Sequence, residues 1–194
     1  MRRYYMDKIT LWTRQNKKIL NSFENGIYRC KEEYIDEKME NFSNYYKKLY
    51  KWYSRKAEKI VPKPDQEIKY PIWVSVDEDM QLRPNDDSII FKLSIPKNKV
   101  IITDSEKWGY VVNFMYLPKG DKDYKEHKEI LKKYNISDPT ELIMGDTGNF
   151  YPQLKRKVEK SWDRLFQDYN ISDVRQGTIW EIHEEDIIEV LKKS

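Results

Sequence analysis

The sequence predicts an α+β fold, a single domain over residues 1–194 in which short mixed or antiparallel strands form two small sheets with helices at the periphery. Three observations favour this class. Segments with strand-like and helix-like patterns are interspersed along the chain without strict βα repetition. The chain has 194 residues, a length that suits one hydrophobic core. Its hydrophobic content of 39%, with 14% aromatic residues, is sufficient to build that core.

The first part of the chain predicts a compact strand–helix–strand unit. An apolar run predicts a strand over residues 8–13, and residues 16–25 resemble a short helix. Gly26 follows this helix, and glycine takes the left-handed C-cap conformation at little cost. A second strand is expected over residues 27–30.

A long helix is expected from about residue 35 to residue 60. It is predicted by apolar residues at four-three spacing, which places them on one helix face. These residues are Ile35, Met39, Phe42, Tyr46, Leu49 and Tyr53. Pro62 and Pro64 then stop the helix, because proline removes a backbone donor and biases the preceding residue away from helix.

Strands predominate in the middle of the chain. Runs of β-branched and aromatic residues predict strands over residues 72–76, 89–95 and 100–103. Asp104 or Ser105 is then expected to cap a helix, because both side chains accept hydrogen bonds from the free N–H groups of a first helical turn. This helix carries the apolar residues Trp108, Val111, Val112 and Met115, and it closes before Pro118.

The last part of the chain mixes both types of element. Residues 121–149 are polar and predict one short helix, and a further helix is expected around Trp162. Residues 176–182 predict a strand. Residues 184–193 predict a final helix, because acids stand at its start and lysines at its end, as the helix dipole favours.

Charge is distributed unevenly along the chain. Residues 1–60 hold 15 Lys and Arg against 8 Asp and Glu, whereas the whole chain has a net charge of only +3. Aromatic residues lie among the lysines of the expected long helix, a mixture that suits a phosphate backbone and stacked bases. The alternative interpretation is structural, with the aromatic residues in the core and the lysines on a solvated face.

Several classes of protein are disfavoured by the sequence. No apolar run approaches the roughly 20 residues of a membrane span, and the first residues lack the apolar region of a secretory signal, which predicts a cytoplasmic protein. Cys30 is the single cysteine and has no disulfide partner in the chain. No zinc-ligand spacing is present, so no metal is expected. Residues 146–148 match the Asp-Thr-Gly of aspartic proteases, but that chemistry needs two such aspartates, and a turn is the simpler interpretation.

Short aromatic motifs are spread over nearly the whole chain. They comprise Leu11-Trp12-Thr13, Gly26-Ile27-Tyr28, Tyr70-Pro71-Ile72-Trp73, Ile101-Ile102-Thr103-Asp104 followed by Trp108, Ser161-Trp162, and Gln176 with Trp180-Glu181-Ile182. On these motifs the chain resembles an uncharacterised bacterial family whose domain has no known function. The resemblance implies that the pieces form one domain.

A more distant likeness concerns layout. The order of strand, Thr13, helix, Gly26 and strand, with a late glutamine-containing strand, is similar to ADP-ribosyltransferase-fold proteins, which bind NAD in a cleft between two small sheets. The likeness implies a nucleotide-binding protein, active or degenerate, with NAD as the cofactor. Those transferases carry a glutamate two residues after the late glutamine or glutamate. Here Thr178 stands in that position, and Glu181 follows Gln176 by five residues, a spacing that turns it to the opposite face of a regular strand.

Candidate site residues follow from this likeness. Arg14 would hold a phosphate or ribose, with Thr13 beside it, and Trp12 or Trp73 would stack on a flat ring. Gln176 or Glu181 would stabilise positive charge that develops on the sugar during catalysis. The structural interpretation of the same residues is that the tryptophans belong to the core and that the charged side chains form ordinary surface pairs.

The sequence therefore supports two hypotheses, and it does not decide whether the protein is an enzyme. In the first, Arg14 and Gln176 line a nucleotide cleft with tryptophan walls. In the second, the basic aromatic N-terminal third is a non-catalytic module that binds a protein or a nucleic acid. The second predicts one exposed stripe of cations, Lys47, Lys48, Lys51, Arg55 and Lys56.

Overall fold

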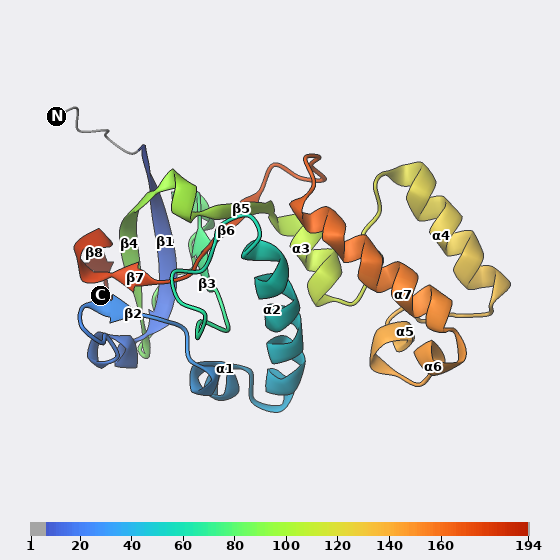
Figure 1. The fold of residues 1–194 in the computed structure, drawn as a ribbon, viewed down its shortest axis with the longest axis horizontal. Helices are drawn as coiled ribbons and strands as arrows, with labels where there is room; N and C mark the ends of the chain where they lie inside the picture. The colour runs from blue at the N-terminus through green and yellow to red at the C-terminus, as the bar shows by residue number, and fades with distance from the viewer. Residues whose placement is uncertain (1–6, 194) are drawn as a thin grey trace. The chain divides into compact units, whose positions relative to one another are not determined.

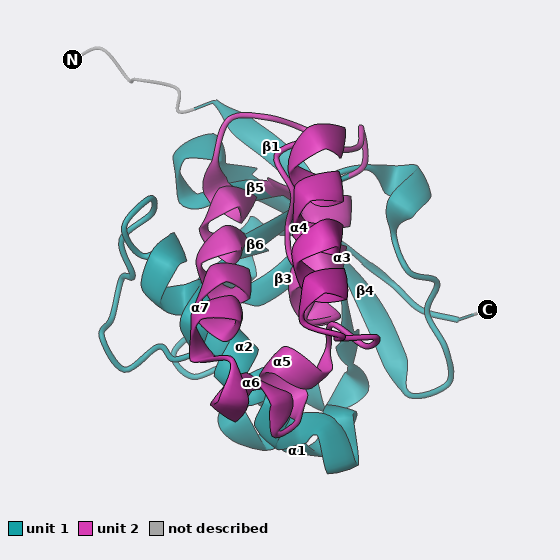
Figure 2. Ribbon diagram, turned by 90° about the vertical axis from the view of Figure 1, so that its right-hand side faces the viewer, with its two compact units in different colours: residues 1–102, 175–194 teal, residues 103–174 magenta. Residues whose placement is uncertain are grey.

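A computed structural model describes residues 7–193 of the chain. The chain divides into two compact units, the first made of residues 1–102 and 175–194 and the second of residues 103–174 (Figure 2). Strands and helices occur in separate stretches rather than in βα repeats, so the predicted α+β class is confirmed. The prediction of a single domain over residues 1–194 stays a prediction.

The first unit is built on a six-stranded sheet with the strand order β5-β6-β3-β1-β4-β8 (Figure 1). Pairing is antiparallel between β1 and both of its neighbours, between β3 and β6, and between β4 and β8. The strands are β1 (Lys8–Asn16), β3 (Ile72–Ser75), β4 (Ser88–Pro96), β5 (Ile101–Asp104), β6 (Arg175–Ile179) and β8 (Ile187–Leu191). A second sheet pairs β2 (Ile27–Tyr28) with β7 (Ile182–His183), so the prediction of two sheets is confirmed.

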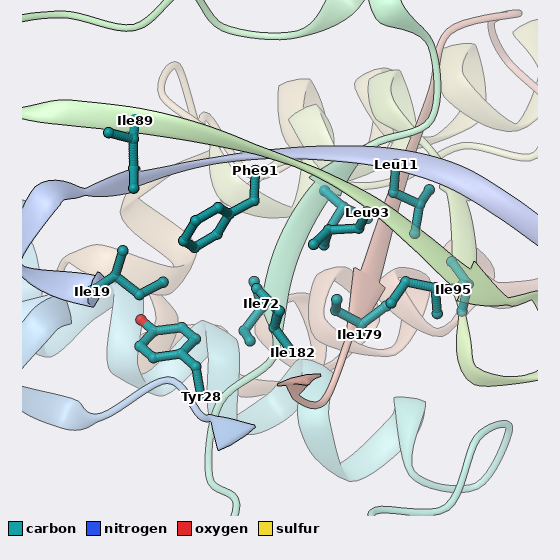
Figure 3. Packing of buried hydrophobic residues seen from close by; sticks show 12 residues of the cluster. Leu11, Ile19, Tyr28, Ile72, Ile89, Phe91, Leu93, Ile95, Ile179 and Ile182 are labelled. Atoms are coloured by element: carbon teal, nitrogen blue, oxygen red, sulfur yellow. The ribbon is translucent and has the colours of Figure 1, made fainter. Parts of the chain in front are cut away.

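The core of the first unit lies between these two sheets. Leu11, Phe91 and Leu93 of the large sheet are fully buried and belong to one cluster with Tyr28 and Ile182 of the small sheet. Figure 3 shows these side chains pointing toward one another. This face of the large sheet therefore excludes water, as the alternating apolar residues of its strands require.

Close packing also explains a glycine in the large sheet. Gly177 of β6 pairs with Val74 of β3. A Cβ atom at position 177 would lie 2.9 Å from Val74 Cγ2, closer than carbon atoms normally approach. Strand β6 therefore needs a residue without a side chain at this point.

The long helix expected from residue 35 to residue 60 is interrupted. The structure contains α1 (Glu32–Met39) and α2 (Ser43–Ala57), separated by a short 3₁₀ turn, η2 (Glu40–Phe42). Glu40 has φ = 45°, a left-handed conformation that ends α1. The predicted apolar face is interrupted at the same place, because Phe42 is 66% exposed while Ile35, Leu49 and Tyr53 are buried.

Other predicted helices also need correction. Residues 16–25 contain only a five-residue 3₁₀ helix, η1 (Lys17–Asn21), and Gly26 has φ = 76° in the turn that follows it. The expected helix over residues 184–193 is wrong. Residues 184–186 form a 3₁₀ turn, η6 (Glu184–Asp186), and β8 follows as a strand. The Ile-Ile-Glu-Val-Leu sequence has high β propensity, and its pairing with β4 outweighs the charge pattern that suggested a helix.

The second unit is helical. It contains α3 (Ser105–Val112), α4 (Asp121–Lys133), α5 (Glu141–Met144), α6 (Thr147–Phe150) and α7 (Pro152–Ser161), followed by the 3₁₀ helix η5 (Trp162–Phe166). Residues 121–149 thus hold three helices rather than the one expected. The predicted cap is confirmed, because the Asp104 side chain accepts hydrogen bonds from the N–H groups of Glu106 and Lys107. Asp146 and Gly148 lie at α6, so the Asp-Thr-Gly motif belongs to a short helix.

Candidate functional site

The strand register brings two predicted site residues, Trp12 and Gln176, into one row on one face of the large sheet. Trp12 pairs with Lys92 on one side and with Ser75 on the other, and Ser75 pairs with Gln176. Residues that are direct partners across antiparallel strands project to the same face. Lys92, Trp12, Ser75 and Gln176 therefore form one row across four strands, which we call the cross-strand row. It lies on the face opposite the core, because its neighbour Leu11 points into that core.

Trp73 lies on the same face, two residues from Ser75 along β3. It pairs with Thr178, and its ring packs against Tyr53 of α2 at a centroid distance of 5.0 Å. The Tyr53 hydroxyl is also 2.7 Å from Thr178 Oγ1. Helix α2 therefore covers this part of the sheet face, and the Trp73 ring belongs to an aromatic cluster rather than standing free to stack on a ligand.

Thr13 points to the other face and is fully engaged. Its hydroxyl donates to the carbonyl oxygen of Trp73 at 2.8 Å and accepts from Gln15 Nε2 at 2.8 Å. The residue is only 3% exposed. These contacts give Thr13 a structural role in joining β1 to β3, and its predicted contact with a cofactor stays a prediction.

Two hydrogen bonds attach the loop over residues 78–83 to strands β3 and β1. Ser75 Oγ donates to the Met80 carbonyl, and Arg14 Nη1 donates to the Arg83 carbonyl, each at 3.4 Å. Between these two contacts lies Gln81, whose side-chain oxygen is buried. The loop is thus tied to β3 and to β1 by one hydrogen bond each.

Three buried polar atoms of this region have no hydrogen-bond partner among residues 7–193. They are Trp12 Nε1, Gln81 Oε1 and Gln176 Nε2. The Trp12 side chain is well enclosed, since the residue is 7% exposed. An unsatisfied buried polar group costs about 1–3 kcal/mol, and native proteins contain few of them. Protein atoms cover all three of them, and none of the three residues lines the cavity at Arg14.

A cavity of about 280 Å³ adjoins the end of β1. Arg14, Lys18 and Lys38 supply cations to its lining, and Tyr28 and Tyr34 supply aromatic walls. The two tyrosine rings are stacked with centroids 6.1 Å apart and an angle of 22° between their planes. Such a combination of rings and cations suits a ligand that carries a flat ring and a negative charge.

The charges in this cavity are partly compensated. Lys18 Nζ donates to Glu37 Oε2 at 3.0 Å, and Asp87 is a second acid in the lining. No ion pair of Lys38 occurs in the described part of the chain. Burial lowers the pKa of Lys38, and the nearby charge of Arg14 lowers it further. A bound anion would relieve this repulsion between the two cations.

Glu181 is held away from the Arg14 cavity by its own partners. Arg29 donates to Glu181 Oε2 from Nε at 3.1 Å and from Nη2 at 3.0 Å, and His183 Nε2 lies 2.8 Å from Glu181 Oε1. Arg29 also pairs with Asp65 at 2.8 Å. Glu181 lines a separate pocket of about 90 Å³ together with Trp180 and His183. Both carboxylate oxygens are therefore engaged, and the catalytic role predicted for Glu181 and Gln176 stays a prediction.

The basic stripe has a different composition from the one expected. Lys48, Lys51 and Arg55 are exposed along α2, whereas the Lys47 side chain is 15% exposed and pairs with Asp36 at 2.8 Å. Lys56 is half-buried. Lys59 is exposed just beyond the helix and continues the stripe at the same spacing.

Sequence reasoning missed several residues of these sites. Tyr28, Tyr34 and Lys38 line the cavity, but they come from separate segments with no motif in common. Ser75 and Gln81 join the sheet site only through the register of β3 and the course of the loop after it. Strand β1 runs to Asn16, beyond the predicted end of this strand at residue 13, and it therefore carries Arg14 on the same side as Trp12.

Residues 7–193 contain neither a membrane-spanning helix nor a cluster of metal ligands. No helix there is long and apolar enough to cross a membrane. No group of three or more His, Cys, Asp and Glu side chains within those residues is arranged to hold a metal ion.

Comparison with known proteins places the chain in a family. The model of a family described as "Domain of unknown function (DUF3841)" matches residues 10–188. No curated protein and no solved structure matches the chain. The match runs through both compact units and covers the cavity and the cross-strand row.

Proposed function

The chain belongs to this family of domains of unknown function (DUF3841), and we propose that it binds a nucleotide through the cavity at Arg14. The observation that carries the proposal is the lining of that cavity, in which Arg14 and Lys38 lie beside the stacked rings of Tyr28 and Tyr34. Arginine binds phosphate through two parallel N–H groups, and lysine adds a second positive charge. The tyrosine rings offer apolar surface to a sugar or base.

The size of the cavity limits the ligand. A volume of about 280 Å³ lies at the lower end of the roughly 300–1,000 Å³ that is typical of small-molecule sites. A mononucleotide, or one half of a dinucleotide such as NAD, fits this scale. NAD remains the first dinucleotide to test, because the layout of the sequence suggested it.

ADP-ribosyl transfer would be an extension of this proposal. An active enzyme needs Gln176 or Glu181 at the sugar of bound NAD. Glu181 is already bound to Arg29 and His183, so a transferase would have to release this carboxylate first. The contacts thus favour a binding protein, or a degenerate transferase, over an active one.

Isothermal titration of the purified protein with AMP, ADP-ribose and NAD tests the proposal. We expect binding that weakens at least tenfold, about 1.4 kcal/mol, in Arg14→Ala and in Lys38→Ala. Lys17→Ala is the matched control, because Lys17 is exposed beside the cavity but does not line it. Absence of binding at millimolar ligand, or equal binding by Arg14→Ala, would contradict the proposal.

A second candidate function rests on the stripe of α2. Lys48, Lys51, Arg55 and Lys59 follow one another at spacings of three or four residues, so they are neighbours along one side at intervals of roughly 5–6 Å. No ion pair engages these four side chains among the residues that the structure describes. A row of cations at this spacing suits the phosphates of a nucleic acid, and the Lys51 ammonium also lies over the Tyr70 ring at 5.8 Å.

Salt dependence distinguishes this candidate from nucleotide binding. Binding of a fluorescent single-stranded oligonucleotide should weaken with salt at a logarithmic slope of about −3, the value for four phosphate contacts. The double variant Lys48→Ala/Arg55→Ala should reduce the slope to about half. Lys132→Ala/Lys133→Ala removes two exposed lysines of α4 and serves as the control. An unchanged slope in the α2 variant would exclude the stripe as the binding surface.

A further inference from the structure

Strand β8 forms a free edge of the large sheet. It stands at one end of the strand order, next to β4 (Figure 1). Within residues 7–193, no strand pairs with its other side. The backbone N–H and C=O groups along such an edge can pair with a further strand, and natural proteins usually protect them from doing so.

The sequence of β8 is apolar although the strand is exposed. Ile188 is 56% exposed and Val190 is 38% exposed. Val190 pairs with Phe91, so it lies on the core side of the sheet, at the margin of the buried cluster. The one charged side chain of the strand is Glu189, whose Oε2 lies 3.9 Å from Lys92 Nζ on the neighbouring strand. Such a composition favours burial of the edge against another strand.

Opposite charges stand at the two ends of β8. Glu184 and Glu185 are exposed in the turn before the strand, and Lys192 and Lys193 are exposed directly after it. Lys193 pairs with Asp86 at 2.9 Å, whereas the other three form no ion pair with the residues that the structure describes. A strand of five residues is about 17 Å long, so the acids and the lysines of one chain are too far apart to pair with each other.

A second copy of the chain carries charges that match these ends. Two copies related by a two-fold axis place their β8 strands antiparallel, so that the start of each strand lies beside the end of the other. The acids of each copy then lie beside the lysines of the other copy at both ends of the pair. A parallel arrangement would bring like charges together. An unrelated strand would need the same order of charges by chance, whereas a second copy always has it.

We propose that β8 is a dimerisation edge, at which two copies of this chain join their large sheets into one continuous antiparallel sheet. Ile188 and Val190 are then covered, and the acids and lysines that flank the strand fix its direction. Pairing through one strand gives a small interface, so the dimer is reversible. The edge contains no residue that lines the Arg14 cavity, so this inference does not depend on nucleotide binding.

Sedimentation equilibrium of the purified protein tests the dimer. We expect the average mass to rise with protein concentration to twice the mass of one chain, and the dissociation constant to increase with salt. Ile188→Lys places a charge on the edge and should weaken dimerisation at least tenfold. Ile102→Lys is the matched control, because Ile102 is 47% exposed on β5, the strand at the opposite end of the strand order.

Charge reversal tests the antiparallel arrangement. The variant Glu184→Lys/Glu185→Lys has lysines at both ends of β8, and Lys192→Glu/Lys193→Glu has acids at both ends. Each variant alone should dimerise at least tenfold more weakly than the wild type, because like charges then meet. An equimolar mixture of the two should recover the wild-type affinity, since every lysine end meets an acid end. This recovery would also show that both variants are folded.

A control and three contrary outcomes complete the test. Lys132→Glu/Lys133→Glu makes the same change of charge on exposed residues of α4 and should dimerise as the wild type does. The mass of a single chain at every concentration would overturn the proposal, and so would growth beyond two chains. A dimer that tolerates Ile188→Lys, or charge variants that fail to recover when mixed, would show that β8 is not the interface.

Discussion

A single buried histidine makes the stability of the protein sensitive to acid. His127 is 2% exposed, is stacked on Tyr116 at a centroid distance of 4.0 Å, and has no hydrogen-bond partner for either ring nitrogen among residues 7–193. Burial, aided by the charge of Lys157, lowers the pKa of His127 from 6.5 to about 4. The unfolded chain therefore binds a proton at this site at a higher pH than the folded protein does.

The direction of the effect follows from this difference in pKa. The stabilising contribution of neutral His127 is complete above about pH 6.5 and is lost as the pH falls toward 4, at a total cost on the order of 3 kcal/mol. His127→Leu should make the free energy of unfolding less dependent on pH in this window. Urea denaturation at pH 7 and at pH 4.5 measures it, with His183→Gln as the control. An identical pH dependence in His127→Leu and the wild type would contradict the assignment.

Asp104 shows how one side chain can hold distant backbone segments. Its carboxylate accepts from the N–H groups of Glu106 and Lys107 at the start of α3, from those of Ile171 and Ser172, and from the Ser172 hydroxyl. Burial raises the pKa of Asp104, but the hydrogen bonds from Ser172 and Ile171 outweigh it and hold the pKa below its usual value.

Removing this carboxylate should be costly. Asp104→Ala leaves buried N–H groups unsatisfied and removes the cap of α3, so we expect a loss of about 3 kcal/mol in the free energy of unfolding. Chemical denaturation at neutral pH measures the loss. Asp173→Ala, at an exposed neighbouring position, is the control and should change stability by less than about 0.5 kcal/mol. A similar small change in Asp104→Ala would show that the network is dispensable.

At the scale of elements, local patterns predicted strands better than helices. The β-branched runs located β3, β4 and β5 to within a residue or two, because each strand fills one side of a buried sheet. The break between α1 and α2 depends on the left-handed conformation of Glu40, which apolar spacing does not reveal. The acid-to-lysine pattern of residues 184–193 suggested a helix, but the partner strand β4 decides the conformation of β8.

The residues of the candidate site also differ in how far the sequence could predict them. Trp12 could be chosen because it lies on the strand predicted over residues 8–13, and Arg14 was chosen by likeness to the transferases as the cation that follows this strand directly. Lys38 and Gln81 could not, since they come from a helix and a loop whose positions depend on tertiary structure. Glu181 was chosen for its place near a late glutamine, and the sequence contained no sign that Arg29 and His183 would bind it.

Strand β6 offers a test of packing at the scale of one element. Gly177→Ala places a methyl group 2.9 Å from Val74 Cγ2 and 3.4 Å from Val100 Cγ1, so the sheet must shift to admit it. We expect a loss of about 1–3 kcal/mol in the free energy of unfolding, the usual cost of overpacking a core. Thermal denaturation measures the loss, and Gly109→Ala, where nothing lies within 4 Å of the new atom, is the control. Equal melting temperatures for the two variants would contradict the close approach.

For the whole molecule, the same two kinds of variant test whether residues 1–194 fold as one domain. Asp104→Ala weakens the second compact unit, and Gly177→Ala weakens the first. Two features favour a single transition. Strand β5 runs from one unit into the other, and the family match spans residues 10–188 without a break. We therefore expect both variants to shift the whole unfolding curve, seen identically by near-UV and far-UV circular dichroism. Two separate transitions, each sensitive to only one of the variants, would instead show that the units fold independently, because each variant would then act only on the unit that contains it.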